Sequence, residues 1–108
     1  MTNKNYISGR KFEYRVRDYF ESIGYFVLRS AGSHTPVDLL AVNKKCGMIY
    51  LIQCKHGTNK ISKIDIEKLF KIAQYFDASI AIVATTEKRK MKLSMISPGL
   101  NLIPTTEI

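Results

Sequence analysis

VDLLAVNKKCGMIYLIQCK, the stretch formed by residues 37–55, decides the fold of this chain. Two apolar runs flank a polar turn that contains Gly47, and this pattern is typical of a β-hairpin. Asp38 lies near the start of the first run, and Gln53 and Lys55 lie at the end of the second. Because the turn brings these two ends together, an acid, an amide and an ammonium group converge at one edge of a small sheet.

The polar side chains of this hairpin form a candidate active site. Strand side chains alternate between faces, so Gln53 and Lys55 share one face while Cys54 points to the other. Apolar strands rarely place three such groups together for packing, because burying polar and charged groups is costly. We therefore take Asp38, Gln53 and Lys55 as the centre of the site.

Composition favours a basic protein with one folded domain, residues 1–108, and a core over about residues 8–97. The 108 residues are 45% hydrophobic, and their net charge of +8 favours a polyanionic partner, in the first place nucleic acid. The alternative is a merely basic protein.

We expect no membrane association, since no apolar run is long enough to span a bilayer and no signal peptide is visible. Cys46 and Cys54 lack metal-ligand spacing with the histidines, which predicts free thiols and a cytoplasmic location.

A first helix is predicted over residues 9–22, after a frayed segment, residues 1–7, and before Gly24 as its C-cap. Glu13 lies at the edge of the apolar stripe and is able to point along the core boundary toward the sheet. The alternative is a solvated acid paired with Arg17. The stripe itself consists of Phe12, Val16, Tyr19, Phe20 and Ile23.

A strand over residues 25–29 is followed by a loop, residues 30–36, rich in small and hydroxyl residues. Its amides and hydroxyls are able to hold a phosphate, or it is an ordinary mobile loop. Within it, His34 is either a DNA contact or an idle loop residue, since no partner acid is fixed beside it. A polar segment, residues 56–60, follows the hairpin.

A second helix is predicted from the cap at Ser62 to about Phe76. Its inward stripe consists of Ile66, Leu69, Phe70, Ala73 and Phe76. Apolar residues on the opposite side, Ile64, Ile72 and Tyr75, are either isolated exposed residues or a dimer surface, which Met91 or Met95 would extend.

The rest of the chain completes an α/β fold with a mixed central sheet flanked by helices. Residues 79–84 are apolar throughout, which predicts a central strand, and the helix before them makes a crossover. Residues 87–92 are predicted as a basic turn or hairpin tip, residues 93–97 as a final strand and residues 98–108 as a short tail.

The polar groups of the hairpin fit metal-dependent phosphodiester hydrolysis. This chemistry uses a hard divalent cation held by oxygen ligands, with a positive group near the transition-state charge. Asp38 supplies a carboxylate and Lys55 an ammonium group. The side-chain oxygen of Gln53 and the backbone carbonyl of Cys54 are able to complete the protein ligands.

Four segments in order, SGRKFE (8–13), GYFVLRSAGS (24–33), VDLLA (37–41) and QCK (53–55), resemble a known family. The sequence is similar to the archaeal-type Holliday junction resolvases of the PD-(D/E)XK nuclease superfamily from about residue 8 to 86. The resemblance implies a restriction-endonuclease-like fold and a homodimer that cuts two strands of a four-way DNA junction with Mg²⁺. It also implies that Glu13, Asp38 and Lys55 are catalytic and that Arg29 and Ser33 contact the substrate.

Two positions depart from the family pattern. Gln53 stands where the family usually has Glu, and a Gln-x-Lys motif resembles the modification-directed restriction nucleases, which still cleave. Tyr14 stands where a basic residue is common, which leaves Arg10 or Arg15 to supply that charge.

The sequence thus predicts a junction-resolving endonuclease that uses Mg²⁺, with Mn²⁺ as a substitute. The alternatives are another DNA nuclease of the superfamily, of restriction or repair type, and a catalytically silent DNA-binding relative. The expected catalytic residues are Glu13, Asp38, Gln53 and Lys55, and the expected metal ligands are Asp38, Gln53, Glu13 and the Cys54 carbonyl. We expect DNA contacts from Arg10, Arg15, Arg29, Ser30, Ser33, His34, Lys60, Lys88, Arg89 and Lys90.

Overall fold

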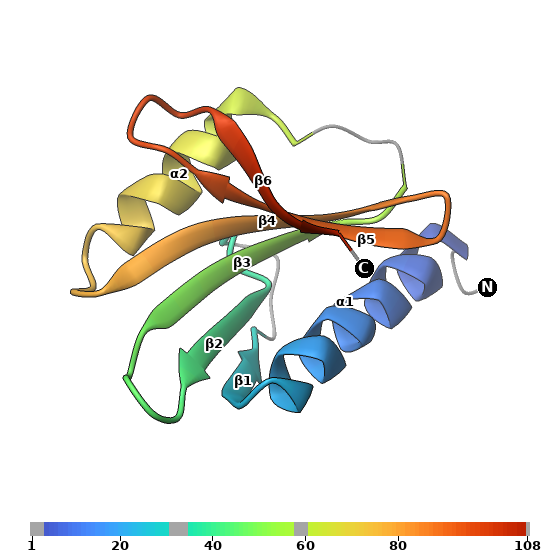
Figure 1. The fold of residues 1–108 in the computed structure, drawn as a ribbon. Coiled ribbons are helices and arrows are strands. Elements are labelled where there is room, and N and C mark those ends of the chain that lie inside the picture. The colour runs from blue at the N-terminus through green and yellow to red at the C-terminus, as the bar shows by residue number, and fades with distance from the viewer. Residues whose placement is uncertain (1–3, 31–34, 58–60, 108) are drawn as a thin grey trace.

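The computed structural model describes residues 4–30, 35–57 and 61–107. They form two helices and six strands (Figure 1). The elements are α1 (Lys4–Ser22), β1 (Tyr25–Arg29), β2 (Leu39–Asn43), β3 (Ile49–Lys55), α2 (Lys63–Ala73), β4 (Ser79–Glu87), β5 (Lys90–Ile96) and β6 (Leu102–Glu107).

The strands form one mixed sheet in the order β1-β2-β3-β4-β5-β6, as the sequence pattern predicts for a mixed α/β fold. All neighbouring strands are antiparallel except β3 and β4, which are parallel because α2 carries the chain back between them. The apolar strand β4 lies between β3 and β5, so its predicted central position is confirmed.

Each helix buries one apolar stripe against a different face of the sheet. Phe12, Val16 and Phe20 of α1 pack with alternate residues of β2 and β3, such as Ile52. Leu69 of α2 packs with the intervening residues, such as Leu51, on the opposite face. Side chains on β2 and β3 therefore point alternately toward α1 and α2, as the pleat requires.

The hairpin predicted over residues 37–55 is present as β2 and β3. Leu39 pairs with Ile52 and Val42 with Ile49, and the turn between the strands contains Gly47 at a φ of +76°. Glycine adopts such a positive φ without strain because it has no Cβ atom. The register places Asp38, one residue before β2, beside the end of β3.

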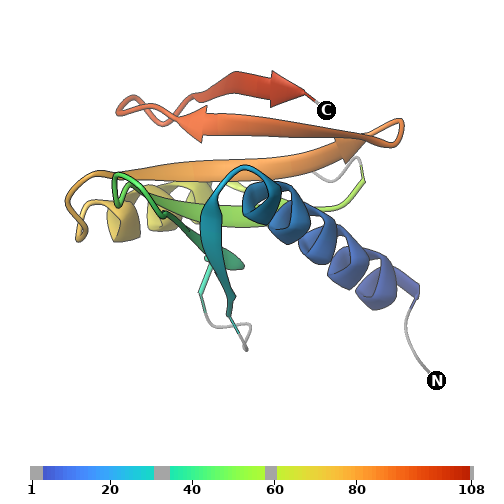
Figure 2. The same cartoon turned by 60° about the horizontal axis from the view of Figure 1, so that its bottom comes forward.

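Several predicted boundaries were wrong. Helix α1 begins at Lys4, so residues 4–7 are helical rather than frayed. The predicted tail, residues 98–108, contains β6, which pairs with β5 across a register shift between Leu93 and Ser94. Figure 2 shows β6 at the outer edge of the sheet, beyond β5.

The second helix is also shorter than predicted. It ends at Ala73, and Phe76, which was expected in the inward stripe, is 43% exposed. In the first helix region Ile23 was likewise expected in the stripe, but it follows the end of α1 and is 50% exposed. Within the described residues, no helix is long and apolar enough to cross a membrane.

The hairpin between β4 and β5 is tight and left-handed in its backbone. Glu87 pairs with Lys90, so Lys88 and Arg89 are the two loop residues, and their φ angles are 51° and 67°. Positive φ at both positions is the mark of a type I′ turn, whose twist matches that of the strands. The basic tip expected over residues 87–92 is therefore present at the end of the sheet where β3 also ends, but its turn consists of Lys88 and Arg89 alone, because β4 extends to Glu87 and β5 begins at Lys90.

Candidate active site

Alternation along β3 directs the candidate site residues to one face of the sheet. Tyr50, Ile52 and Cys54 pack in the cluster beneath α1, whereas Leu51 packs beneath α2. Gln53 and Lys55 are therefore directed to the α2 side of the sheet, with Cys54 on the other side. This is the arrangement that the sequence predicts.

Asp38 is fixed by three hydrogen bonds at the end of the hairpin. Its backbone N–H donates to the Ile52 carbonyl at 2.8 Å, and its carbonyl accepts from the Ser30 N–H at 2.9 Å. Its carboxylate Oδ2 accepts from the Cys54 N–H at 2.7 Å. Asp38 thus ties β1 to β3, and its carboxylate is held against the backbone of the QCK segment.

A cleft of about 320 Å³ brings the predicted residues together. Its lining residues are Glu13, Thr35, Pro36, Asp38, Gln53, Cys54, Lys55, Asp65 and Lys68. Glu13 reaches it from α1 and Asp65 and Lys68 reach it from α2, so both layers of the fold contribute. All four residues expected to be catalytic line this one cleft.

Burial raises the pKa of Asp38 from 3.8 to about 6. The hydrogen bond from the Cys54 N–H opposes this shift because it stabilises the charged form. The charge of Glu13 raises the pKa of Asp38 further, while Lys55 and Arg29 lower it. Burial likewise raises the pKa of the Cys54 thiol, so this thiol stays protonated.

Gln53 is buried in a way that packing does not explain. Its side chain is 7% exposed, and its Oε1 atom lacks a hydrogen-bond partner within the described residues. An unmade hydrogen bond at a buried amide oxygen costs about 1–3 kcal/mol. Gln53 lines the cleft together with Asp38, and a hard divalent cation is a partner that would satisfy its amide oxygen.

The ligands for such a cation are few. Among the described residues, no group of three His, Cys, Asp or Glu side chains is close enough to hold a metal ion. The residues present fit a cation such as Mg²⁺, which keeps several waters and needs only one or two carboxylates. A softer metal with tetrahedral nitrogen or sulfur ligands does not fit.

Glu13 points toward the sheet rather than along its own helix. Its Oε1 accepts from Nε of Arg29 on β1 at 2.9 Å, and both side chains are partly buried. The alternative ion pair with Arg17 is absent from the described contacts, since Arg17 pairs with Asp18 and Glu21. Arg29 thus holds the α1 carboxylate at the border of the cleft.

Tyr14 stands where the family often has a basic residue, and three arginines lie around its ring. The guanidinium groups of Arg10, Arg17 and Arg29 lie 5.7, 4.8 and 5.5 Å from the centre of its ring. Arg10 Nε also donates to the Tyr14 hydroxyl at 2.9 Å. Such cation–π contacts keep the arginines clustered next to Glu13.

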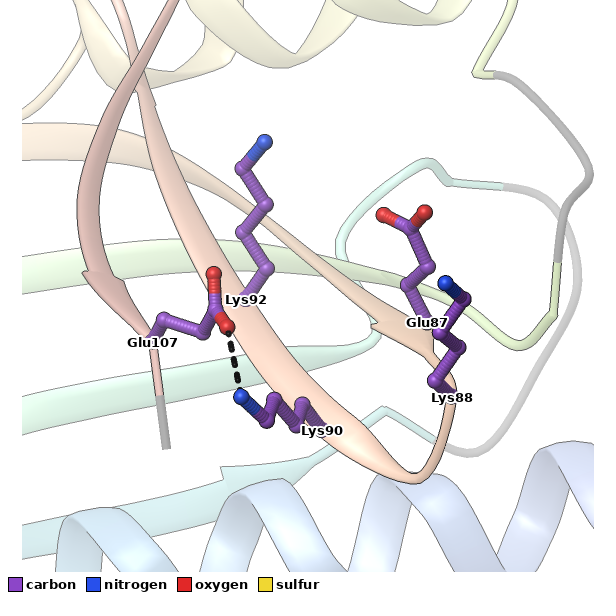
Figure 3. Close-up of a pocket in the computed structure, with 5 residues that line it drawn as sticks. All are labelled: Glu87, Lys88, Lys90, Lys92 and Glu107. Atoms are coloured by element: carbon purple, nitrogen blue, oxygen red, sulfur yellow. Dashed lines mark ion pairs between the residues drawn. The ribbon is translucent and has the colours of Figure 1, made fainter.

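The basic hairpin tip is partly neutralised by a strand that the sequence did not predict. Lys90 pairs with Glu107 of β6 at 3.5 Å, beside a shallow pocket that Glu87, Lys88 and Lys92 also line (Figure 3). Lys88 and Arg89 are exposed.

Of the other expected DNA contacts, Arg10 and Arg15 are exposed on α1 and Ser30 is half-buried. Ser33, His34 and Lys60 lie outside the described residues.

The expected dimer surface was partly wrong. Ile64 and Tyr75 are 64% and 75% exposed, as predicted. Ile72, however, packs against the α2 core cluster, because α2 buries a wider stripe than its spacing indicates. Met91 is 1% exposed, and Met95 packs on the α1 side of the sheet, so neither shares a surface with Ile64.

Sequence reasoning missed two residues of the cleft, Asp65 and Lys68. Asp65 belongs to the cap of α2, where its N–H donates to Ser62 Oγ at 3.1 Å. The two residues are three apart on α2 and therefore share a helix face. That spacing could have indicated that the two side chains lie together. Whether they reach the cleft, however, depends on how α2 packs against the sheet.

Residues 5–91 match the restriction endonuclease family Mrr_cat. The chain belongs to this family. Over 74 residues it is 38% identical to the crossover junction endodeoxyribonuclease Hjc of Methanocaldococcus jannaschii, a match that covers 66% of this chain. It covers 53% of that protein, so the chain spans about half the length of this curated relative.

A solved structure is similar in fold. The Holliday junction resolvase Hjc of Archaeoglobus fulgidus superposes with a TM-score of 0.64 at 24% identity, over 77% of this chain and 72% of that one. The restriction-endonuclease-like fold and the resemblance to the archaeal resolvases, both expected from the sequence, are thereby confirmed.

Proposed function

We propose that this restriction endonuclease family member is a metal-dependent DNA endonuclease that acts on four-way junctions. The observation that carries the proposal is the convergence of Asp38, Gln53, Lys55 and Glu13 on one cleft. The similarity to a curated junction endonuclease supports the choice of substrate. The net charge of +8 fits a DNA partner.

The proposed metal ligands are Asp38, Gln53, Glu13 and the Cys54 carbonyl. When bound there, Mg²⁺, or Mn²⁺ in its place, would polarise the scissile phosphate and lower the pKa of a water nucleophile. Lys55 lies in the same cleft and its ammonium group stabilises the negative charge that develops on the phosphate. The hydrogen bond from the Cys54 N–H holds the Asp38 carboxylate in place during the reaction.

The DNA path is proposed to run from the cleft to the basic hairpin tip. Strands β3 and β4 are parallel, with Lys55 opposite Thr85, so the cleft and the β4–β5 tip lie at the same end of the sheet. Lys88 and Arg89 on that tip, and Arg10, Arg15 and Arg29 near α1, are the proposed phosphate contacts. Ser30, Ser33, His34, Lys60 and Lys90 complete the proposed set.

The natural test is cleavage of matched synthetic substrates. We expect the protein to cut a four-way junction in Mg²⁺ in preference to a flap or a plain duplex. Asp38→Asn should abolish cutting and leave junction affinity unchanged or higher, because a negative charge beside phosphate is removed. Preferred cutting of duplex would favour a restriction or repair nuclease. Binding without cutting in either metal would favour a silent relative.

A dimer is proposed because a four-way junction presents two symmetric strands, whereas the described residues of one chain place the proposed metal ligands in a single cleft. The exposed side chains of Ile64 and Tyr75 on and beside α2 remain candidates for the interface. Light scattering at micromolar concentration should give twice the mass of 12.3 kDa, and Ile64→Glu should reduce it. A monomer would overturn the symmetric arrangement, whereas a dimer that survives Ile64→Glu would exclude this surface.

A further inference from the structure

The first turns of α2 bring a carboxylate to the cleft from the side on which the other groups project. Gln53 and Lys55 are directed toward the α2 side of the sheet, and so is Asp38, which alternates with the α1-facing Leu39. Asp65 and Lys68 of α2 line the same cleft. Glu13 belongs to α1, which packs on the opposite face of the sheet. Asp65 belongs to α2 and is therefore on the same side of the sheet as the hairpin groups.

The Asp65 carboxylate has no structural task within the described residues. In a capping box the acid at this position accepts from the N–H of the cap residue. Here only the other half is made, since the Asp65 N–H donates to Ser62 Oγ. Hydrogen bonds and ion pairs to the Asp65 carboxylate are absent from the described contacts, even though Lys68 is nearby on the same helix face.

Gln53 independently marks this cleft as a ligand site. Its Oε1 is buried without a partner among the described residues, and its side chain lines the cleft with Asp65. An amide oxygen is neutral, however, so it offers a cation less electrostatic stabilisation than a carboxylate. A cleft that holds a divalent ion through Gln53 is therefore stabilised by further negative charge beside that of Asp38, since Glu13 is already paired with Arg29.

We propose that Asp65 supplies this negative charge and holds the hydrated divalent cation from the α2 side of the cleft. The proposal rests on the proposed function, since it adds a residue to that metal site. Asp65 acts without contacting Asp38, which agrees with the absence of a close group of three ligands among the described residues. Outer contacts of this kind change metal affinity by about 10- to 100-fold.

The test measures metal binding directly, without DNA and without turnover. Mn²⁺ is titrated into the protein by isothermal calorimetry and by electron paramagnetic resonance. We expect Asp65→Asn to raise the Kd by about tenfold or more. Glu67→Gln is the matched control, because it removes the same charge from the same helix at an exposed residue outside the cleft lining. It should change the Kd less than about twofold, since solvent and salt screen its charge.

Three outcomes separate this inference from the proposed function. If Asp38→Asn weakens binding and Asp65→Asn does not, the role of Asp65 is excluded and the metal site stands. If the unsubstituted protein does not bind Mn²⁺, both fall. If Asp65→Asn and Glu67→Gln weaken binding equally, the effect is one of overall charge and the inference is wrong.

A rescue variant guards against a folding defect in Asp65→Asn. Adding Gln53→Glu to Asp65→Asn restores one carboxylate to the cleft, so Mn²⁺ affinity should recover to within about threefold of the unsubstituted protein. Circular dichroism confirms folding of each variant. A folded double variant that still binds Mn²⁺ as weakly as Asp65→Asn would overturn the proposal that the two positions serve the same ion.

Discussion

At Asp38 the requirements of folding stability and of the proposed metal binding conflict. Its position at the end of the β2–β3 hairpin buries the carboxylate, and burial disfavours the charge that metal binding requires. The hydrogen bond from the Cys54 N–H offsets part of that cost. The folded protein therefore carries a carboxylate that is less stable when charged than it would be in water.

The first prediction concerns this cost in the metal-free protein. The pKa of Asp38 is about 6 when folded against 3.8 as its model-peptide value, so the folded state binds this proton more tightly. Its contribution to the free energy of unfolding is present below pH 3.8 and is lost as the pH rises through 6. With chelator present, Asp38→Asn should match the parent near pH 4 and exceed it at pH 8 by on the order of 1 kcal/mol, after allowing for solvent exposure.

The measurement is urea unfolding from pH 4 to pH 8 for both proteins. Asp18→Asn serves as the control, because Asp18 is an exposed acid on α1. A stability difference between the parent and Asp38→Asn that does not grow with pH would refute the burial of a costly charge at Asp38.

The second prediction concerns Gln53, where a neutral amide replaces the usual family acid. Gln53→Glu places a carboxylate at a side chain that is 7% exposed. We expect the metal-free variant to be less stable than the parent at pH 8, because the charge is buried. Metal should reverse this order and lower the Mg²⁺ concentration needed for half-maximal cleavage.

Thermal unfolding with chelator and then with Mg²⁺, beside a cleavage titration, gives both readouts. If Gln53→Glu is inactive while the parent cuts, the amide N–H₂ group is required and the assignment of Gln53 as an oxygen ligand is wrong.

At the level of elements, the β4–β5 hairpin joins a strained turn to the proposed DNA contacts. Lys88 and Arg89 occupy positive φ, where residues with a Cβ atom are disfavoured. Asn and Gly adopt these positions readily in type I′ turns. The two basic residues therefore lower the stability of the turn, and we expect their charges to strengthen DNA binding instead.

The third prediction follows from this conflict. The double change Lys88→Asn and Arg89→Gly should raise the free energy of unfolding by about 1 kcal/mol. It should also flatten the dependence of log Kd for junction DNA on log salt by about two units, one for each charge removed. Urea unfolding and fluorescence anisotropy at several salt concentrations measure the two effects.

Lys44→Gln with Lys45→Gln is the control for that experiment. It removes two charges from the β2–β3 turn, at the end of β3 away from the cleft. An equal loss of salt dependence in this control would assign the effect to net charge and not to the tip.

Elements with strong local patterns were predictable from the sequence, and those that depend on neighbours were not. The hairpin and β4 have apolar runs bounded by turn residues. By contrast β6 contains Pro104 and does not alternate between apolar and polar residues, because it is an edge strand whose side chains are mostly exposed. Residues 4–7 precede the apolar stripe and were assigned to a frayed end, although α1 extends through them.

The candidate site divides in the same way. Asp38, Gln53 and Lys55 follow from the hairpin alone, since register and alternation fix their side. Asp65 and Lys68 require the packing of α2, which carries the chain from β3 to β4. The exposure of Ile72 was predicted wrongly for the same reason. Helical spacing shows which residues share a face, but not how many of them the sheet buries.

For the whole molecule, the layers explain why one cleft draws on so much of the chain. The sheet separates α1 from α2, and the cleft lies where groups from both layers meet at the end of β3. Arg29 and Glu13 join β1 to α1 at this border. Cleavage, metal binding and DNA affinity are therefore expected to respond to substitutions on either layer.

The outermost strand has a consequence for aggregation. An edge strand offers unpaired backbone groups to which another chain can add. In the described sheet β6 is one of two edge strands, the other being β1, and its Leu102 and Ile103 are 39% and 43% exposed. Pro104, which lacks an N–H donor, interrupts this edge, and the register shift beside its partner Ser94 distorts it further.

The fourth prediction is that Pro104 protects the protein against self-assembly into fibrils. Pro104→Val completes an apolar β-prone edge, so thioflavin T fluorescence at 37 °C should rise sooner than for the parent. Pro98→Val makes the same chemical change in the turn before β6 and should not shorten the lag time. Equal lag times for the two variants would show that the edge is guarded by something other than this proline.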